Sequence, residues 1–137
     1  MTRVFIDTGP IVAFLNGRDR FHPWAREVVA TLDPPVFSCE PVLSEACFLV
    51  RNLAGGPDAV LELVARGLLD VSFSVSSELH DIRRLMKKFA RVPMSLADAC
   101  LVRMTELERD CTVITLDGDF RIYRRNRRQL VPVVMPS

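Results

Sequence analysis

Acidic residues directly follow two apolar segments of this sequence. Residues 4–6 are a β-branched and aromatic run typical of a buried strand, and Asp7 ends that run. Residues 111–116 form a second apolar run, which Asp117 and Asp119 follow. Because ligands bind beyond the carboxyl ends of parallel strands, acids that follow two neighbouring strands would meet at one edge of a sheet.

Two further acids are expected on helices and could reach the same edge. Glu45 falls at the border of the apolar stripe of a helix predicted over 41–53, and Asp98 lies in the first turn of a helix predicted over 96–109. Several carboxylates in a partly dry cleft stay ionised only if a cation compensates them. Oxygen ligands select a hard ion such as Mg²⁺ or Mn²⁺, which can supply hydroxide and neutralise a phosphodiester oxygen. The pattern therefore indicates metal-assisted phosphoryl transfer.

Each acid also has a simpler structural interpretation. Asp7 could cap the helix that follows it, and Asp117 could belong only to a turn. Ser95 and Asp98 have the spacing of a capping box, and Glu45 could be an ordinary boundary residue of its helix. The functional interpretation is favoured because strand-end acids and helix-borne acids occur together in one chain.

The segments that position these acids alternate between strand and helix patterns. Strands are predicted at residues 4–6, 36–39, 71–75 and 111–116, with a last edge strand at 131–134. Helices are predicted at residues 11–15, 21–32, 41–53, 58–69, 77–91 and 96–109. Such alternation predicts an α/β fold with right-handed crossovers. We expect one domain spanning 1–137, with a central, mostly parallel sheet of four to five strands flanked by helices.

Composition narrows the class of protein. Apolar residues make up 49% of the chain and charged residues 26%, which is ordinary for a globular domain. A membrane-spanning helix needs about 18 consecutive apolar residues, and no apolar run of this sequence is that long. The first apolar run ends at Asp7 and is too short for a signal peptide. We therefore expect a cytoplasmic protein with no membrane association. The four cysteines lack a C-x-x-C pair and are expected to be reduced core residues: Cys39, Cys47, Cys100 and Cys111.

The net charge of +1 hides an asymmetry. The last 17 residues contain no acid and five bases: Arg121, Arg124, Arg125, Arg127 and Arg128. A second basic group loads one face of the helix predicted over 77–91: Arg83, Arg84, Lys87, Lys88 and Arg91. Basic clusters indicate a polyanionic partner, although a solvated tail and a solvated helix face are the simpler alternatives.

Four segments together resemble the motifs of PIN-domain nucleases. They are Val-Phe-Ile-Asp-Thr-Gly-Pro-Ile-Val-Ala-Phe-Leu at 4–15, a single Glu on the third helix (Glu45), Ser-Leu-Ala-Asp-Ala at 95–99, and Val-Ile-Thr-Leu-Asp-Gly-Asp-Phe at 113–120. The resemblance covers nearly the whole chain, in order. A short chain of this kind is most similar to VapC-type toxins, the nuclease half of toxin–antitoxin pairs.

The resemblance implies that four acids form a metal site: Asp7, Glu45, Asp98 and Asp117. Of these, Asp7, Asp98 and Asp117 would be the metal ligands. Thr8 and Thr115 would support the site, and Asp119 would be an auxiliary acid. Both Asp117 and Asp119 follow the strand, and Asp117 is the one that matches the Thr-x-Asp pattern.

The same resemblance implies Mg²⁺- or Mn²⁺-dependent cleavage of RNA, a homodimer, and a small antitoxin protein as inhibitor. The arginines at 121–128 could then hold RNA phosphates beside the metal. The alternative is a non-catalytic PIN fold that binds RNA or an antitoxin, but a pure binder has no need for clustered like charges. A phosphatase with Asp7 as nucleophile is disfavoured, because Gly9 stands where its general acid would be.

Overall fold

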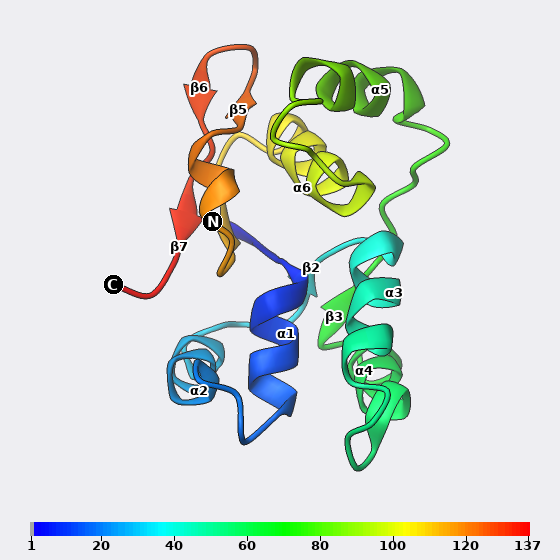
Figure 1. The fold of residues 1–137 in the computed structure, drawn as a ribbon, viewed down its shortest axis with the longest axis vertical. Coiled ribbons are helices and arrows are strands. Elements are labelled where there is room, and N and C mark those ends of the chain that lie inside the picture. Colours follow the sequence, from blue (N-terminus) through cyan, green and yellow to red (C-terminus); the bar gives the residue numbers. More distant parts are fainter. Residues whose placement is uncertain (1) are drawn as a thin grey trace.

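A five-stranded parallel sheet forms the centre of the computed structural model, which describes residues 2–137 (Figure 1). The strands lie in the order β3 (Leu69–Asp70), β2 (Val36–Phe37), β1 (Arg3–Ile6), β4 (Cys111–Ile114) and β7 (Val133–Val134). β1 pairs with β4 in a register that sets Ile6 opposite Ile114. Asp7 and Thr115 therefore follow neighbouring strands at the same edge of the sheet. The sequence predicted that the segments that carry Asp7 and Asp117 would meet at such an edge.

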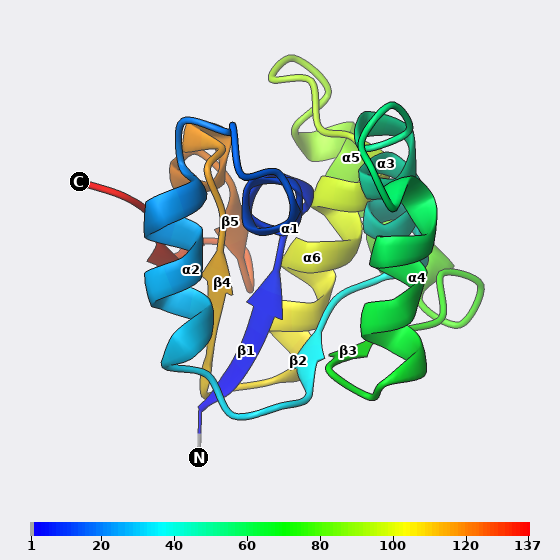
Figure 2. The same ribbon diagram turned by 90° about the horizontal axis from the view of Figure 1, so that it is seen from below.

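Six helices within the described residues flank the sheet. They are α1 (Thr8–Leu15), α2 (His22–Ala30), α3 (Glu40–Leu49), α4 (Gly56–Ala65), α5 (Leu79–Lys88) and α6 (Leu96–Leu107). Figure 2 shows α2 beside β4, and α3 and α4 together on the opposite side of the molecule. The predicted α/β class and the parallel sheet are confirmed. None of the helices within residues 2–137 is long and apolar enough to span a bilayer.

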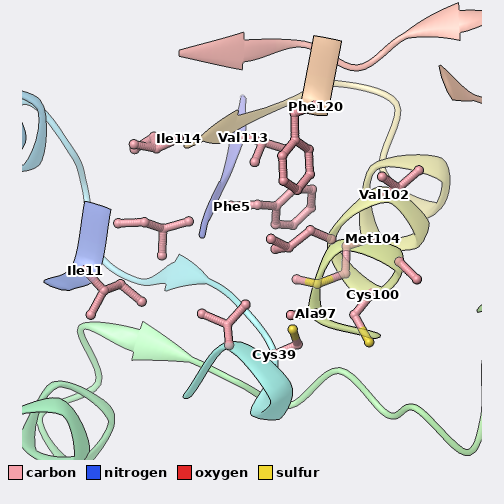
Figure 3. Packing of buried hydrophobic residues seen from close by; sticks show 14 of the residues in the cluster. Phe5, Ile11, Cys39, Ala97, Cys100, Val102, Met104, Val113, Ile114 and Phe120 are labelled. Atoms are coloured by element: carbon pink, nitrogen blue, oxygen red, sulfur yellow. The ribbon is translucent and has the colours of Figure 1, made fainter. Parts of the chain in front are cut away.

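The two faces of the sheet are covered by different helices. Phe5 of β1 packs toward α6 together with Val113 of β4 and Phe120 (Figure 3). Val4, the preceding residue, lines the other face with Trp24 of α2, because successive side chains of a strand alternate between faces. Burial on both sides explains why β1 and β4 appear in the sequence as continuous apolar runs.

The third strand and the helix before it differ from the prediction. α4 ends at Ala65 rather than at 69, because Gly67 has a φ of 73° and the Leu68 N–H bonds back to the Leu63 carbonyl. β3 is Leu69–Asp70 rather than 71–75. The Asp70 side chain accepts the Ser72 N–H at 2.8 Å, which turns the chain away from the sheet.

A short hairpin in the basic segment was not predicted from the sequence. The one-turn helix η1 (Gly118–Arg121) leads into β5 (Arg124–Arg125), which pairs antiparallel with β6 (Gln129–Leu130). Asn126 and Arg127 adopt positive φ values of 48° and 76° to make the turn without a glycine. The predicted edge strand at 131–134 is present as Val133–Val134, parallel to β4.

Candidate functional site

Asp7 is buried at the point where β1 becomes α1. It is the N-cap of α1, and its Oδ1 accepts the Thr8 N–H at 2.8 Å. Its Oδ2 accepts the hydroxyl of Thr115 at 2.8 Å. The residue is only 7% exposed, and this burial raises its pKa from 3.8 to about 6 against the two hydrogen bonds, which lower it. The sequence allowed a cap or a site acid, and the geometry is compatible with both at once.

Thr115 joins the ends of β1 and β4. Its hydroxyl, fully buried, donates to Asp7 and accepts the Asp117 N–H at 3.0 Å. Asp117 in turn caps η1, since its Oδ1 accepts the Asp119 N–H at 2.9 Å. This leaves Asp117 Oδ2 without a hydrogen bond to any described residue. The predicted turn at Asp117 is present, and it holds one carboxylate oxygen while the other stays available.

Asp98 reaches the same edge from the first turn of α6. The capping box is present: the Asp98 N–H bonds to Ser95 Oγ at 3.0 Å, and Asp98 Oδ2 accepts the Ser95 N–H at 3.2 Å. Asp98 Oδ2 also accepts the hydroxyl of Tyr123 at 2.8 Å, a contact that the sequence did not predict. Burial raises the pKa of Asp98, and the nearby charge of Asp117 adds to the increase.

Glu45 lies at the exposed border of this group. Its Oε1 accepts the hydroxyl of Thr8 at 2.9 Å, so α3 is linked to the start of α1. Thr8 therefore connects Glu45 to the Asp7 cap, much as Thr115 connects Asp117 to it. Glu45 is exposed, and its Oε2 accepts no hydrogen bond from residues 2–137.

Three of the acids are close enough for their charges to act on one another. The charges of Asp98 and Asp117 both raise the pKa of Asp7, and Asp117 raises that of Asp98. The described residues contain no group of three or more His, Cys, Asp or Glu side chains already arranged around a metal position. The donor set still fits a hard divalent cation, because all donors are carboxylate oxygens and a cation would relieve their mutual repulsion.

The five arginines of the basic segment fall into two groups. Arg125 donates to the carbonyls of Thr105 at 2.9 Å and Glu108 at 3.4 Å, which fastens the hairpin to the end of α6. Arg124 donates to three carbonyls of its own segment, those of residues 121–123. The side chains of the other three arginines are exposed, with no hydrogen bond or ion pair to residues 2–137: Arg121, Arg127 and Arg128.

The second basic group lies beside the hairpin. Arg83, Lys87 and Arg91 are exposed on or just after α5, and Lys88 Nζ donates to the Arg127 carbonyl at 2.7 Å. A polar cavity of about 520 Å³ lies where α5, α6 and the hairpin meet. Arg84 is not free, because it bonds to Glu106 at 2.9 Å. Figure 1 shows α5 and the hairpin adjacent at one end of the molecule.

Comparison with known proteins identifies the fold. The family model of the PIN domain matches residues 4–126. Ribonuclease VapC26 of Mycobacterium tuberculosis is 24% identical over 116 residues, which cover 83% of this chain and 86% of that protein.

Two crystal structures are similar in fold. VapC20 of Mycobacterium tuberculosis, a toxin that cleaves the sarcin-ricin loop, superposes with a TM-score of 0.72 at 22% identity, over 85% of this chain and 91% of that one. FitAcB from Neisseria gonorrhoeae superposes with a TM-score of 0.55 at 18% identity, over 83% of this chain and 87% of that one. The family match spans most of the sequence, includes the acid-bearing segments and agrees with the predicted resemblance to VapC-type toxins. The chain therefore belongs to the PIN-domain family.

Proposed function

We propose that this protein is a metal-dependent endoribonuclease and the toxin of a toxin–antitoxin pair. The observation that carries the proposal is that acids from four separate chain segments lie near one sheet edge: hydrogen bonds through two threonines link three of them, and the charge of Asp98 acts on Asp7. Thr8 connects Glu45 to the Asp7 cap, and Thr115 connects Asp7 to Asp117. The similarity to proteins named as VapC ribonuclease and toxin supports RNA as the substrate.

Asp7, Asp98 and Asp117 would hold a Mg²⁺ or Mn²⁺ ion, and Asp119 would assist. When bound, such an ion neutralises the clustered acids and stabilises charge on a phosphodiester oxygen. Glu45 Oε2 accepts no hydrogen bond within residues 2–137 and can orient the water that attacks phosphorus in line. Because water is the nucleophile, an RNA with a 2′-deoxynucleotide at the cleaved position should still be cleaved.

RNA would bind through the exposed part of the basic segment. Arg121 is two residues after Asp119, so it lies close to the acids along the chain. Arg127 and Arg128 extend the positive surface over the hairpin, and Lys87 continues it on α5. Arg124 and Arg125 would contribute mainly by holding the hairpin in place. The logarithm of the RNA-binding constant should fall linearly with the logarithm of the salt concentration. Each phosphate contact that is lost should make this slope less steep by about 0.7.

We also propose a cognate antitoxin protein as partner, a homodimer, and a cytoplasmic location. The similarity to a VapC toxin supports the antitoxin. Exposed apolar residues on two packed helices support self-association: Phe48 at 61% and Leu49 at 55% on α3, and Leu61 at 48% on α4.

RNA cleavage assays test the central proposal. The substrates are structured RNAs that include the sarcin-ricin loop, because the similar VapC20 cleaves that loop. Cleavage should require Mg²⁺ or Mn²⁺, stop in chelator, and fall at least 100-fold in Asp7→Asn and Asp98→Asn, whereas Asp33→Asn, a loop acid, should retain it. Full activity in chelator, or in both site variants, would contradict the proposal.

A non-catalytic binding module is the second candidate. The observation that favours it is the set of exposed arginines on and beside the hairpin and exposed apolar side chains on α3 and α4, because such surfaces can bind RNA or a protein without a metal. Metal titration separates the two candidates. A chain without measurable Mn²⁺ affinity at millimolar concentration would fit the binding module and not the nuclease.

A further inference from the structure

Tyr123 is the one fully buried residue of the basic segment 121–128. Its ring is fully buried between two aromatic neighbours in edge-to-face contact. The ring centroids lie 5.3 Å from Phe89 of the segment after α5 and 5.2 Å from Phe120 of η1. Such contacts fix the ring, so its hydroxyl has little freedom of position. This geometry excludes base stacking by Tyr123, because neither face of the ring is open to an RNA base.

The hydroxyl of Tyr123 is directed at one of the acids. It donates to Asp98 Oδ2 at 2.8 Å, and the same oxygen accepts the Ser95 N–H at 3.2 Å. Two donors therefore occupy Oδ2, whereas Asp98 Oδ1 accepts no hydrogen bond from residues 2–137. The carboxylate is held by one oxygen, and the other remains available to a cation.

The capping box alone does not require this second donor. Ser95 and Asp98 already satisfy each other's backbone N–H groups. A capping carboxylate without a further partner can still rotate about its terminal torsion, which is broad for Asp. The added hydroxyl restricts that rotation, and groups that orient a carboxylate ligand tune its affinity for metal.

We propose that Tyr123 is a positioning residue that orients Asp98 so that Oδ1 is presented to the divalent cation. The inference rests on the proposed function, since it assumes that Asp98 is a metal ligand. It also joins the basic segment to the acids, because Tyr123 lies between η1 and the hairpin. The hairpin and the metal site are then held in one fixed relation.

Tyr123→Phe tests the role of the hydroxyl while keeping the ring and its packing. Mn²⁺ binding, measured by calorimetry or by the EPR signal of the free ion, should weaken about 10-fold. RNA affinity in chelator should not change, because the exposed arginines are untouched. Thr105→Val is the matched control: it removes a fully buried hydroxyl of α6 that donates to the Val102 carbonyl at 2.6 Å and touches no acid. Its Mn²⁺ affinity should equal that of the wild type, and its melting temperature should fall.

Fluorine NMR gives a second measurement without any substitution. Tyr123 is the single tyrosine of the chain, so biosynthetic incorporation of 3-fluorotyrosine labels this position alone. Substoichiometric Mn²⁺ should broaden the one resonance strongly, and Mg²⁺ should shift it without broadening.

The outcomes separate this inference from the proposed function. Wild-type Mn²⁺ affinity in Tyr123→Phe, or a fluorine resonance that saturating Mn²⁺ leaves sharp, would overturn the positioning role. A wild-type protein that binds no Mn²⁺ at millimolar concentration would overturn the metal-dependent nuclease itself.

Discussion

Asp7→Asn should make the metal-free protein more stable while it abolishes metal binding. The carboxylate of Asp7 is buried beside two other acids, so ionisation of this group opposes folding. An amide of the same shape can still accept the Thr8 N–H and cap α1, since Asn and Asp are comparable N-caps. The variant therefore loses a buried charge and keeps the hydrogen bond to the Thr8 N–H, but the buried Thr115 hydroxyl loses its acceptor, Asp7 Oδ2, which offsets part of the gain.

The size of the effect follows from the pKa of Asp7, which rises from 3.8 to about 6 on folding. A group with a higher pKa in the folded state binds more protons when folded, so stability falls as the pH rises from about 4 to about 6. Above that range the cost is about 3 kcal/mol, at about 1.36 kcal/mol per pKa unit. For 137 residues the cost of the charge corresponds to about 10 °C in melting temperature at pH 8, and the loss of the acceptor for the Thr115 hydroxyl reduces the gain seen in the variant. At pH 5 the cost of the charge should be about half as large.

Thermal unfolding followed by circular dichroism in chelator, at pH 8 and pH 5, measures this difference. Asp33→Asn removes the same charge from an exposed loop position and should leave the melting temperature nearly unchanged. Added Mn²⁺ should stabilise the wild type and not Asp7→Asn. A variant that melts below the wild type at pH 8 would refute the argument that the charge of Asp7 destabilises the folded protein. A difference in melting temperature that does not depend on pH would refute it as well.

Three further predictions concern the hairpin and the exposed surface. Arg125→Ala should lower the free energy of unfolding by about 2 to 4 kcal/mol, because it leaves backbone carbonyls at the end of α6 without their donor. Arg128→Ala should change the free energy of unfolding by no more than about 0.5 kcal/mol and should reduce the salt slope of RNA binding by about 0.7. Equal losses of stability for Arg125→Ala and Arg128→Ala in chemical denaturation would contradict a structural role for Arg125 and an RNA-binding role for Arg128. The double variant Phe48→Ser and Leu49→Ser should shift the protein from dimer to monomer in analytical ultracentrifugation, and an unchanged mass would exclude this face as the interface.

The strand-end acids could be predicted because the strands before them are buried on both faces. β1 and β4 are central, so their apolar runs are continuous and end sharply at Asp7 and near Asp117. β3 could not be placed from the sequence in the same way. Its two residues are strand only because β2 pairs with them, and the alternating pattern at 71–75 is a stronger local signal than the true strand.

Tyr123 and Arg125 lay within a cluster whose local pattern indicated only positive charge. Their roles depend on tertiary neighbours: Asp98 for the tyrosine, and the carbonyls at the end of α6 for the arginine. The spacing of Phe120 and Tyr123, three residues apart, was the one available sign that this segment turns an aromatic face inward. The catalytic and RNA-binding roles of the named residues stay predictions until the assays above are done.

The outermost strands of the sheet also limit how another protein can dock. β3 and β7 each contain two residues, and Pro132 and Pro136 flank β7 without N–H groups to offer. Neither edge strand offers enough free backbone N–H and C=O groups for a peptide to pair with it and extend the sheet. We therefore expect any inhibitory protein to recognise side chains on the helices, and this fold to resist fibre formation by lateral sheet growth.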